Sequence, residues 1–161
     1  MIELIVVLAI VAILSISVTA SVTNSIKRIQ LENAADKLTS DLRYAQYMAT
    51  STATWYGVSF EVTPLNHVYV YTTTGTKDTI ATDPGKTNAT FFVDLSSTYG
   101  TTISTVTVEG GAAKIEFSPS GAPYRDKAGA VLTAESVVTL SNGVSTKTVR
   151  ITPGTGRIYQ Q

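Results

Sequence analysis

The chain contains no cysteine among its 161 residues. That absence excludes a disulfide framework, a thiolate zinc site and a cysteine nucleophile. Charged residues make up only 15% of the chain, against roughly 25% in ordinary soluble domains, and the formal net charge is +0. The chain therefore has no broad electrostatic field with which to attract nucleic acid or anionic lipid.

The usual motifs of enzymes are missing as well. There is no G-x-S-x-G elbow, no H-E-x-x-H pair and no phosphate-binding glycine loop, and the acidic residues are scattered. His67 is the only histidine, so no second imidazole can complete a metal site with it. The spacing of Asp78, Asp83 and Asp94 does not fit a calcium-binding EF-hand loop. We therefore expect no enzyme activity and no bound metal or cofactor.

Glycine and proline are absent from the first third of the chain. Without a strong helix breaker, this part is predicted to form one helix from about Ile2 to about Thr50. Between Glu3 and Lys27 it carries no charged side chain. A helix of that length spans roughly 30–35 Å, about the thickness of the hydrocarbon layer of a bilayer. We predict that residues 1–26 cross a membrane or fill the core of a filament.

The second half of this helix is predicted to be amphipathic. Apolar residues recur at alternating spacings of four and three, at Leu31, Ala35, Leu38, Leu42, Ala45 and Ala49. Charged residues occupy the other faces, at Lys27, Arg28, Glu32, Asp36, Lys37, Asp41 and Arg43. This pattern indicates that one face of the helix packs against a folded domain.

After the helix, the sequence changes to short β-branched and aromatic runs separated by turn residues. Strands are predicted over residues 57–62, 67–73, 90–95, 103–109, 113–118, 135–141 and 146–152. Asn142-Gly143 indicates a hairpin between the last two. The polar, threonine-rich residues 75–88 lack periodicity and are expected to form an exposed loop. The fold class is therefore α+β, with a long N-terminal α-helix packed on a small antiparallel β-sheet domain, and the globular part spans residues 27–161.

Four segments carry a resemblance to a known family. The run Ile2-Glu3-Leu4-Ile5-Val6-Val7-Leu8-Ala9-Ile10-Val11-Ala12-Ile13-Leu14 resembles the start of type IV pilins and type II secretion pseudopilins, in which a single acid heads an apolar helix. The other three resemble the GspH/FimT subgroup: Leu38-Thr39-Ser40-Asp41-Leu42-Arg43-Tyr44-Ala45-Gln46 with Val58-Ser59-Phe60, Ile115-Glu116-Phe117-Ser118-Pro119-Ser120-Gly121, and Val149-Arg150-Ile151-Thr152 with Gly156-Arg157-Ile158. Together the segments are distributed over most of the length of the chain, from Ile2 to Ile158.

The resemblance implies a pilin-like life cycle. A prepilin in the bacterial inner membrane would be cleaved by a prepilin peptidase, methylated at its N-terminus and passed to an assembly platform. It would then join copies of itself, or other pilins or pseudopilins, in a periplasmic or extracellular helical filament. The side chains expected to mediate assembly are Glu3 and the apolar residues Ile2, Leu4, Ile5, Val6, Val7, Leu8, Ile10, Val11, Ile13 and Leu14.

The start of the chain departs from the usual family pattern. Family members generally have a short lead before the acid, often Phe-Thr-Leu, whereas only Met1 and Ile2 precede Glu3 here, with no basic residue among them. A basic secretory leader is therefore expected to be absent or already removed. Two alternatives would account for this difference: the chain starts slightly inside the mature protein, or the processing site is atypical.

Glu3 has two interpretations. A carboxylate at the edge of a hydrocarbon-spanning helix is costly unless it is paired. In pilins its implied partner is the free N-terminal amine of a neighbouring subunit, and this pair would set the axial register of the filament. In the alternative, Glu3 lies at the level of the lipid headgroups in a plain single-span anchor.

Two features near the C-terminal half suggest weaker hypotheses. Lys147, Arg150 and Arg157 make the last strands mildly basic, and some FimT-like minor pilins bind DNA through a C-terminal Gly-Arg segment. So few cations without a stacking platform predict only weak, salt-sensitive binding, and a solvated strand face is the simpler interpretation. Asn88 begins a glycosylation acceptor pattern, Asn88-Ala89-Thr90.

The predicted function is that of a structural filament subunit. The sequence leaves open whether this subunit is major or minor, and whether the filament is a pilus or a secretion pseudopilus. The alternatives are a minor tip or initiator pilin that binds DNA or another surface ligand, and a plain single-pass anchored binding module.

Overall fold

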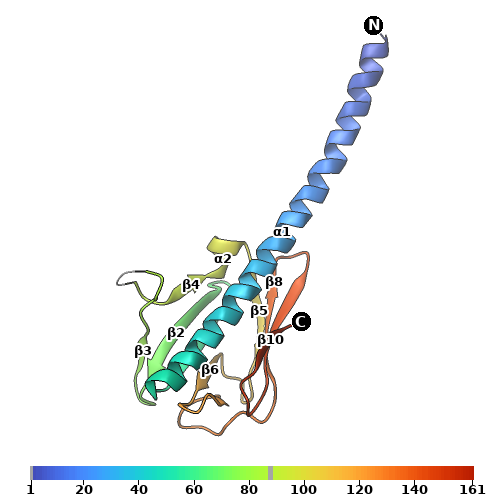
Figure 1. Cartoon of the computed structure of the whole chain (residues 1–161). Helices are drawn as coiled ribbons and strands as arrows, with labels where there is room; N and C mark the ends of the chain where they lie inside the picture. Colours follow the sequence, from blue (N-terminus) through green and yellow to red (C-terminus); the bar gives the residue numbers. More distant parts are fainter. Residues whose placement is uncertain (1, 87–88) are drawn as a thin grey trace.

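The computed structural model describes residues 2–86 and 89–161, and within helix α1 the side chains of residue 9 and residues 12–21 lie outside this description. Helix α1 (Ile2–Thr52) is continuous and contains 51 residues, which confirms the prediction of one long helix. Its N-terminal half projects away from the rest of the molecule, while its C-terminal half lies along the β-rich domain (Figure 1). The helix ends just before Ala53, which adopts a positive φ of 51°.

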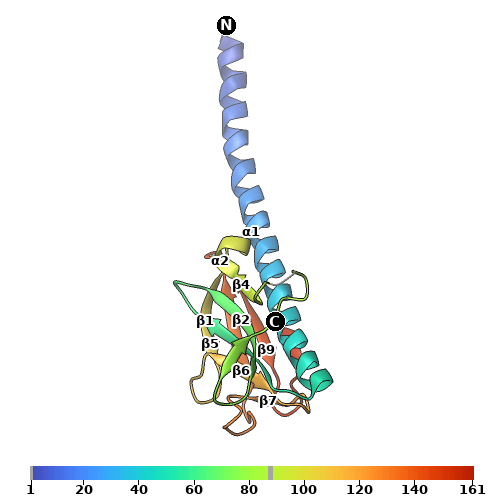
Figure 2. The same cartoon turned by 90° about the vertical axis from the view of Figure 1, so that its left-hand side faces the viewer.

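The β-rich domain contains two antiparallel sheets. The first has the order β3-β2-β1-β6-β7, with β4 also paired to β2. Its strands are β1 (Tyr56–Glu61), β2 (His67–Thr73), β3 (Asp78–Ile80), β4 (Phe92–Asp94), β6 (Lys114–Phe117) and β7 (Pro123–Tyr124). The second has the order β10-β9-β8-β5 and consists of β5 (Thr102–Thr107), β8 (Ser136–Ser141), β9 (Thr146–Ile151) and β10 (Ile158–Gln160). A short helix, α2 (Leu95–Tyr99), connects β4 to β5 near the point where α1 leaves the domain (Figure 2).

The core forms where the C-terminal half of α1 covers both sheets. The predicted apolar face of the helix is buried, with Leu31, Ala35, Leu38, Leu42, Ala45 and Ala49 at most 2% exposed, and the neighbouring Ala34 is buried as well. Alternate residues of the strands pack against it, including Val58, Phe60, Val70, Ile115, Phe117, Ile103, Leu140, Val149 and Ile151. The α+β fold class and the amphipathic pattern are therefore confirmed.

Several short elements were not predicted. The expected loop over residues 75–88 contains strand β3, so the prediction of a structureless segment was wrong for those residues. All three residues of β3 are exposed, and an edge strand without a buried face gives no alternating pattern in the sequence. Strands β7 and β10 and helix α2 are also too short, at two to five residues, to produce a periodic signal.

The sequence pattern placed Asp41 on a charged face of the helix, but in the structure this residue is buried. It follows the buried Ala34 by two helical turns and is only 2% exposed. Lys37 pairs with its carboxylate and also lies over the ring of Phe91, 4.9 Å from the ring centroid. Burial raises the pKa of Asp41 to about 6, although its bond to Lys37 acts in the opposite direction.

Candidate functional site

The projecting part of α1 exposes a long apolar surface. Among the described side chains, Ile2, Leu4, Ile5, Val6, Val7, Leu8, Ile10 and Val11 are between 52% and 77% exposed. Val22, Ile26 and Ile29 are also exposed nearer the domain, while the side chains of Ile13 and Leu14 lie outside the described residues. Because consecutive residues point in all directions around a helix, this segment is apolar on every side. A surface of this extent is typical of a segment that another molecule covers.

Glu3 lies in the first turn of this helix and is exposed. No described residue forms an ion pair with it. An acid in the first turn interacts favourably with the helix dipole, which contributes about 0.3–1 kcal/mol at an exposed position. Glu3 therefore stabilises the start of its own helix, and this effect does not require a second subunit.

A membrane span was predicted over residues 1–26. Among the described residues, no helix offers a stretch that is both long enough and apolar enough to cross a bilayer.

Three of the segments that carry the family resemblance contact one another, and one of them is part of α1. Gln46 donates hydrogen bonds from Nε2 to the carbonyl oxygens of Gly121, at 2.9 Å, and Gly156, at 3.2 Å. One turn earlier, Arg43 donates from Nη2 to the carbonyl oxygen of Ile158, at 3.1 Å. The helix therefore ties together the turn after β6 and the loop before β10, two segments separated by more than thirty residues. We refer to this contact as the Gln46 junction.

Glycine is required at the Gln46 junction for two reasons. Gly156 is buried and has a φ of +65°, in the left-handed region that side chains rarely adopt. A Cβ atom at this position would also lie 2.7 Å from the carbonyl oxygen of Gly121 and 2.5 Å from Nε2 of Gln46. The glycine of the Gly156-Arg157 segment is thus explained by backbone conformation and packing.

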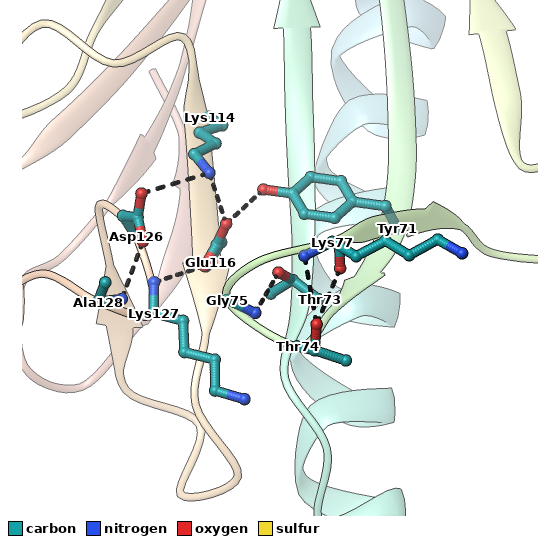
Figure 3. Close-up of polar contacts among 10 residues, drawn as sticks. All are labelled: Tyr71, Thr73, Thr74, Gly75, Lys77, Lys114, Glu116, Asp126, Lys127 and Ala128. Atoms are coloured by element: carbon teal, nitrogen blue, oxygen red, sulfur yellow. Dashed lines mark hydrogen bonds and ion pairs between the residues drawn. The ribbon is translucent and has the colours of Figure 1, made fainter.

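A buried carboxylate organises the outer side of the first sheet. Glu116 is 1% exposed, and it accepts hydrogen bonds from the Tyr71 hydroxyl at 2.8 Å, Lys114 Nζ at 2.9 Å and the Lys127 backbone N–H at 2.6 Å (Figure 3). Gly57 pairs with Tyr71 on one side and with Glu116 on the other. A Cβ at Gly57 would lie 2.4 Å from Cζ of Tyr71, so glycine leaves the space in which this pair forms.

The sequence analysis did not predict the roles of Glu116, Gly57 and Gln46. Glu116 lies between two apolar residues in β6, a pattern that also fits an acid exposed to water. Burial and the bond to Glu116 raise the pKa of the Tyr71 hydroxyl, which keeps it protonated as a donor. The only available signal was Gly57 at the start of a predicted strand, since a glycine in a strand can indicate close approach of another group.

The structure does not bring two of the candidate DNA-contacting cations onto one surface. Lys147 and Arg150 lie three residues apart in β9, so their side chains leave opposite faces of the sheet. Lys147 Nζ lies 3.2 Å from Oε1 of Glu32 on α1, and Arg150 Nη1 lies 2.6 Å from Oε2 of Glu135. Both cations therefore already have an acidic partner within the chain.

Arg157 differs from these two residues. It is exposed in the loop before β10, and its guanidinium lies 5.9 Å from the ring centroid of Tyr159. The hydroxyl of Tyr159 donates to Glu135, and this bond together with Arg150 lowers the pKa of the Glu135 carboxyl. Arg157 thus contacts an aromatic ring, and among the described residues it has no acidic partner within ion-pair distance. The candidate glycosylation site Asn88 lies outside the described residues.

A long helix that projects from a two-sheet domain, with an apolar free half and a buried amphipathic half, defines a pilin-like architecture. The chain is similar to the minor pseudopilin EpsH of the Vibrio cholerae type 2 secretion system, with a TM-score of 0.60, 11% identity, and 82% of this chain and 96% of the other covered. It is also similar to the type IV minor pilin FimU of Pseudomonas aeruginosa, with a TM-score of 0.55, 17% identity, and 83% and 90% of the two chains covered.

These similarities confirm, at the level of the fold, the resemblance to pilins and pseudopilins. A second structure of EpsH gives the same result, with a TM-score of 0.59, 11% identity, and 81% of this chain and 92% of the other covered. No protein-family model and no curated protein sequence matches the chain.

Proposed function

We propose that this chain is a structural subunit of a type IV pilus-like or type II secretion filament, which polymerises through its N-terminal helix and has no enzyme activity. The observation that carries the proposal is the exposed apolar surface of α1, which the described residues of the folded domain leave uncovered. The pilin-like fold supports it, since both similar structures are named as a pilin or a pseudopilin.

In this proposal, residues 1–26 form the membrane and filament-core segment and residues 27–161 form the coat. Removing an exposed Leu, Ile or Val side chain from water stabilises an assembly by roughly 1.5–3 kcal/mol. Eight such side chains lie between Ile2 and Val11 alone, so helices that bundle in a filament core would associate strongly. In lipid this driving force is small, because the acyl chains are as apolar as the helices. An assembly platform that extracts the subunit from the inner membrane is therefore required.

Both similar structures are described as minor subunits, which favours a minor, initiating or tip position for this chain. Processing by a prepilin peptidase, N-terminal methylation and transfer from the inner membrane to a periplasmic or extracellular filament belong to the same proposal. Its partners would be copies of this chain or other pilins and pseudopilins.

Glu3 provides the test of assembly. If its carboxylate pairs with the N-terminal amine of a neighbour, Glu3→Ala and Glu3→Gln will both reduce the filament fraction strongly while leaving the amount of membrane-bound subunit unchanged. The fraction is measured by electron microscopy and immunoblotting of sheared surface or periplasmic material. As a matched control, Asp78→Asn removes an exposed acid of strand β3, outside α1.

Filaments at the wild-type level in both Glu3 variants would contradict the pairing role and leave only the helix-dipole contribution. Native protein found only as dispersed single-pass monomers would contradict the filament proposal itself and favour a plain anchored module.

A further inference from the structure

Three turn residues expose apolar side chains at the end of the domain from which α1 projects. Val62 and Leu65, in the turn between β1 and β2, are 44% and 51% exposed. Val144, at the tip of the hairpin between β8 and β9, is 55% exposed. Turn tips of this kind usually carry polar residues, because water surrounds them on most sides. Three exposed apolar side chains on two turns at one end of a domain therefore indicate a surface that contacts something other than water.

Hydrogen bonds place the hairpin tip at the base of the free helix. Asn142 donates from Nδ2 to the carbonyl oxygen of Lys27, at 2.7 Å. Lys147, on the other side of the tip, pairs with Glu32 of α1. Val144 thus lies at the level where the proposed membrane segment, residues 1–26, ends.

The turn between β1 and β2 is held at the same end of the domain. Asn66 is 3% exposed; its carbonyl oxygen accepts from the Leu95 N–H of α2, and its Oδ1 accepts from the Ile103 N–H. Gly100, which ends α2, lies beside Gln30 of α1. Leu65 therefore belongs to a turn that is fixed to α2, and α2 lies beside α1 where the helix leaves the domain (Figure 2).

Charge at this end does not select an anionic partner. The cations Lys27, Arg28 and Lys147 are balanced by the carboxylates Glu32, Glu61 and Asp94. A partner would therefore be recognised through apolar contact.

We propose that Val62, Leu65 and Val144 insert into the interfacial layer of the bilayer that holds α1, so that the domain rests on the membrane before assembly. This inference rests on the proposed function, because it requires α1 to be in the membrane. One apolar tip would bind a bilayer only weakly, but the helix already holds the domain there, which makes each further contact intramolecular.

The test uses the absence of cysteine, since each introduced cysteine will be the only thiol in the chain. Leu65→Cys and Val144→Cys report on the tips, Ile10→Cys reports on the projecting helix, and the exposed Ser51→Cys, at the far end of α1, is the matched control. The full-length variants are labelled with a fluorophore and reconstituted at low density in phosphatidylcholine vesicles. A lipid with a quencher just below its headgroup is either included or left out, and for position 10 the quencher lies deep in the acyl chain instead.

We expect the quencher lipid to reduce the fluorescence at positions 65 and 144 and to leave position 51 unchanged, without any requirement for anionic lipid. Quenching at position 10 without quenching at 65 and 144 would overturn the inference and leave the proposed function intact. Equal quenching at position 51 would also overturn it, because the domain would then lie on its side.

Two further outcomes count against the inference. If position 10 is not quenched, the membrane stage of the proposed function fails together with it. A change at 65 and 144 that grows with protein density in quencher-free vesicles would assign the tips to a second copy of the chain, and would also overturn it.

Discussion

Replacing Gly156 by alanine tests whether the Gln46 junction holds α1 against the β-rich domain. A left-handed backbone conformation costs a residue with a side chain about 1–2 kcal/mol. The new Cβ would also lie 2.7 Å from the carbonyl oxygen of Gly121, and overpacking of a filled site costs about 1–3 kcal/mol. We expect Gly156→Ala to lower the free energy of unfolding by roughly 2–5 kcal/mol.

Gly154→Ala is the matched control. Gly154 has a similar φ of +72°, but nothing lies within 4 Å of a Cβ placed there. Gly154→Ala should therefore lower the free energy of unfolding only by the backbone contribution of about 1–2 kcal/mol. The difference between the two variants isolates packing at the junction from backbone strain.

The assay is urea unfolding of the full chain in detergent, followed by the fluorescence of Trp55. This residue is the only tryptophan, and its ring packs against Tyr124 of β7 with ring centroids 4.9 Å apart. Equal destabilisation by Gly156→Ala and Gly154→Ala would refute the reasoning, since the junction would then tolerate an added methyl group.

Three further predictions concern a buried acid, the tyrosine–glutamate pair and nucleic acid. As the pH rises from about 3 to about 7, through the unfolded and folded pKa values, the raised pKa of Asp41 should lower the free energy of unfolding by about 3 kcal/mol, because the folded state holds the proton more tightly than the unfolded state. Asp41→Asn should remove this dependence in urea titrations at several pH values, and an unchanged slope would contradict it. Gly57→Ala should lower the free energy of unfolding by about 1–3 kcal/mol, because the Cβ would meet Tyr71 and Glu116, and an unchanged thermal midpoint would argue against this packing. In gel-shift assays the chain should not retain duplex DNA at about 150 mM salt, and retention that Arg157→Ala abolishes would instead favour a DNA-binding tip pilin.

The sequence alone determined the elements that depend on neighbouring residues. The long helix, its change from an apolar to an amphipathic half, the strand over residues 67–73 and the Asn142-Gly143 hairpin all follow from local periodicity and turn chemistry. The candidate assembly surface could be located in the same way, because a charge-free apolar run of this length has few alternative uses. These predictions needed no knowledge of which parts of the chain meet.

Only the tertiary structure decided what the remaining residues do. Lys147 pairs with Glu32, and Gln46 bonds to Gly156, across more than a hundred residues of sequence. Asp41 is buried because the chain around Phe91 folds over a helix face that is polar by its sequence pattern. Periodicity describes the two faces of one element, whereas burial and charge pairing depend on what a distant segment places against each face. That information is absent from any local window of the sequence. For this reason the sequence predicted neither the burial of Asp41 nor the ion pair of Lys147.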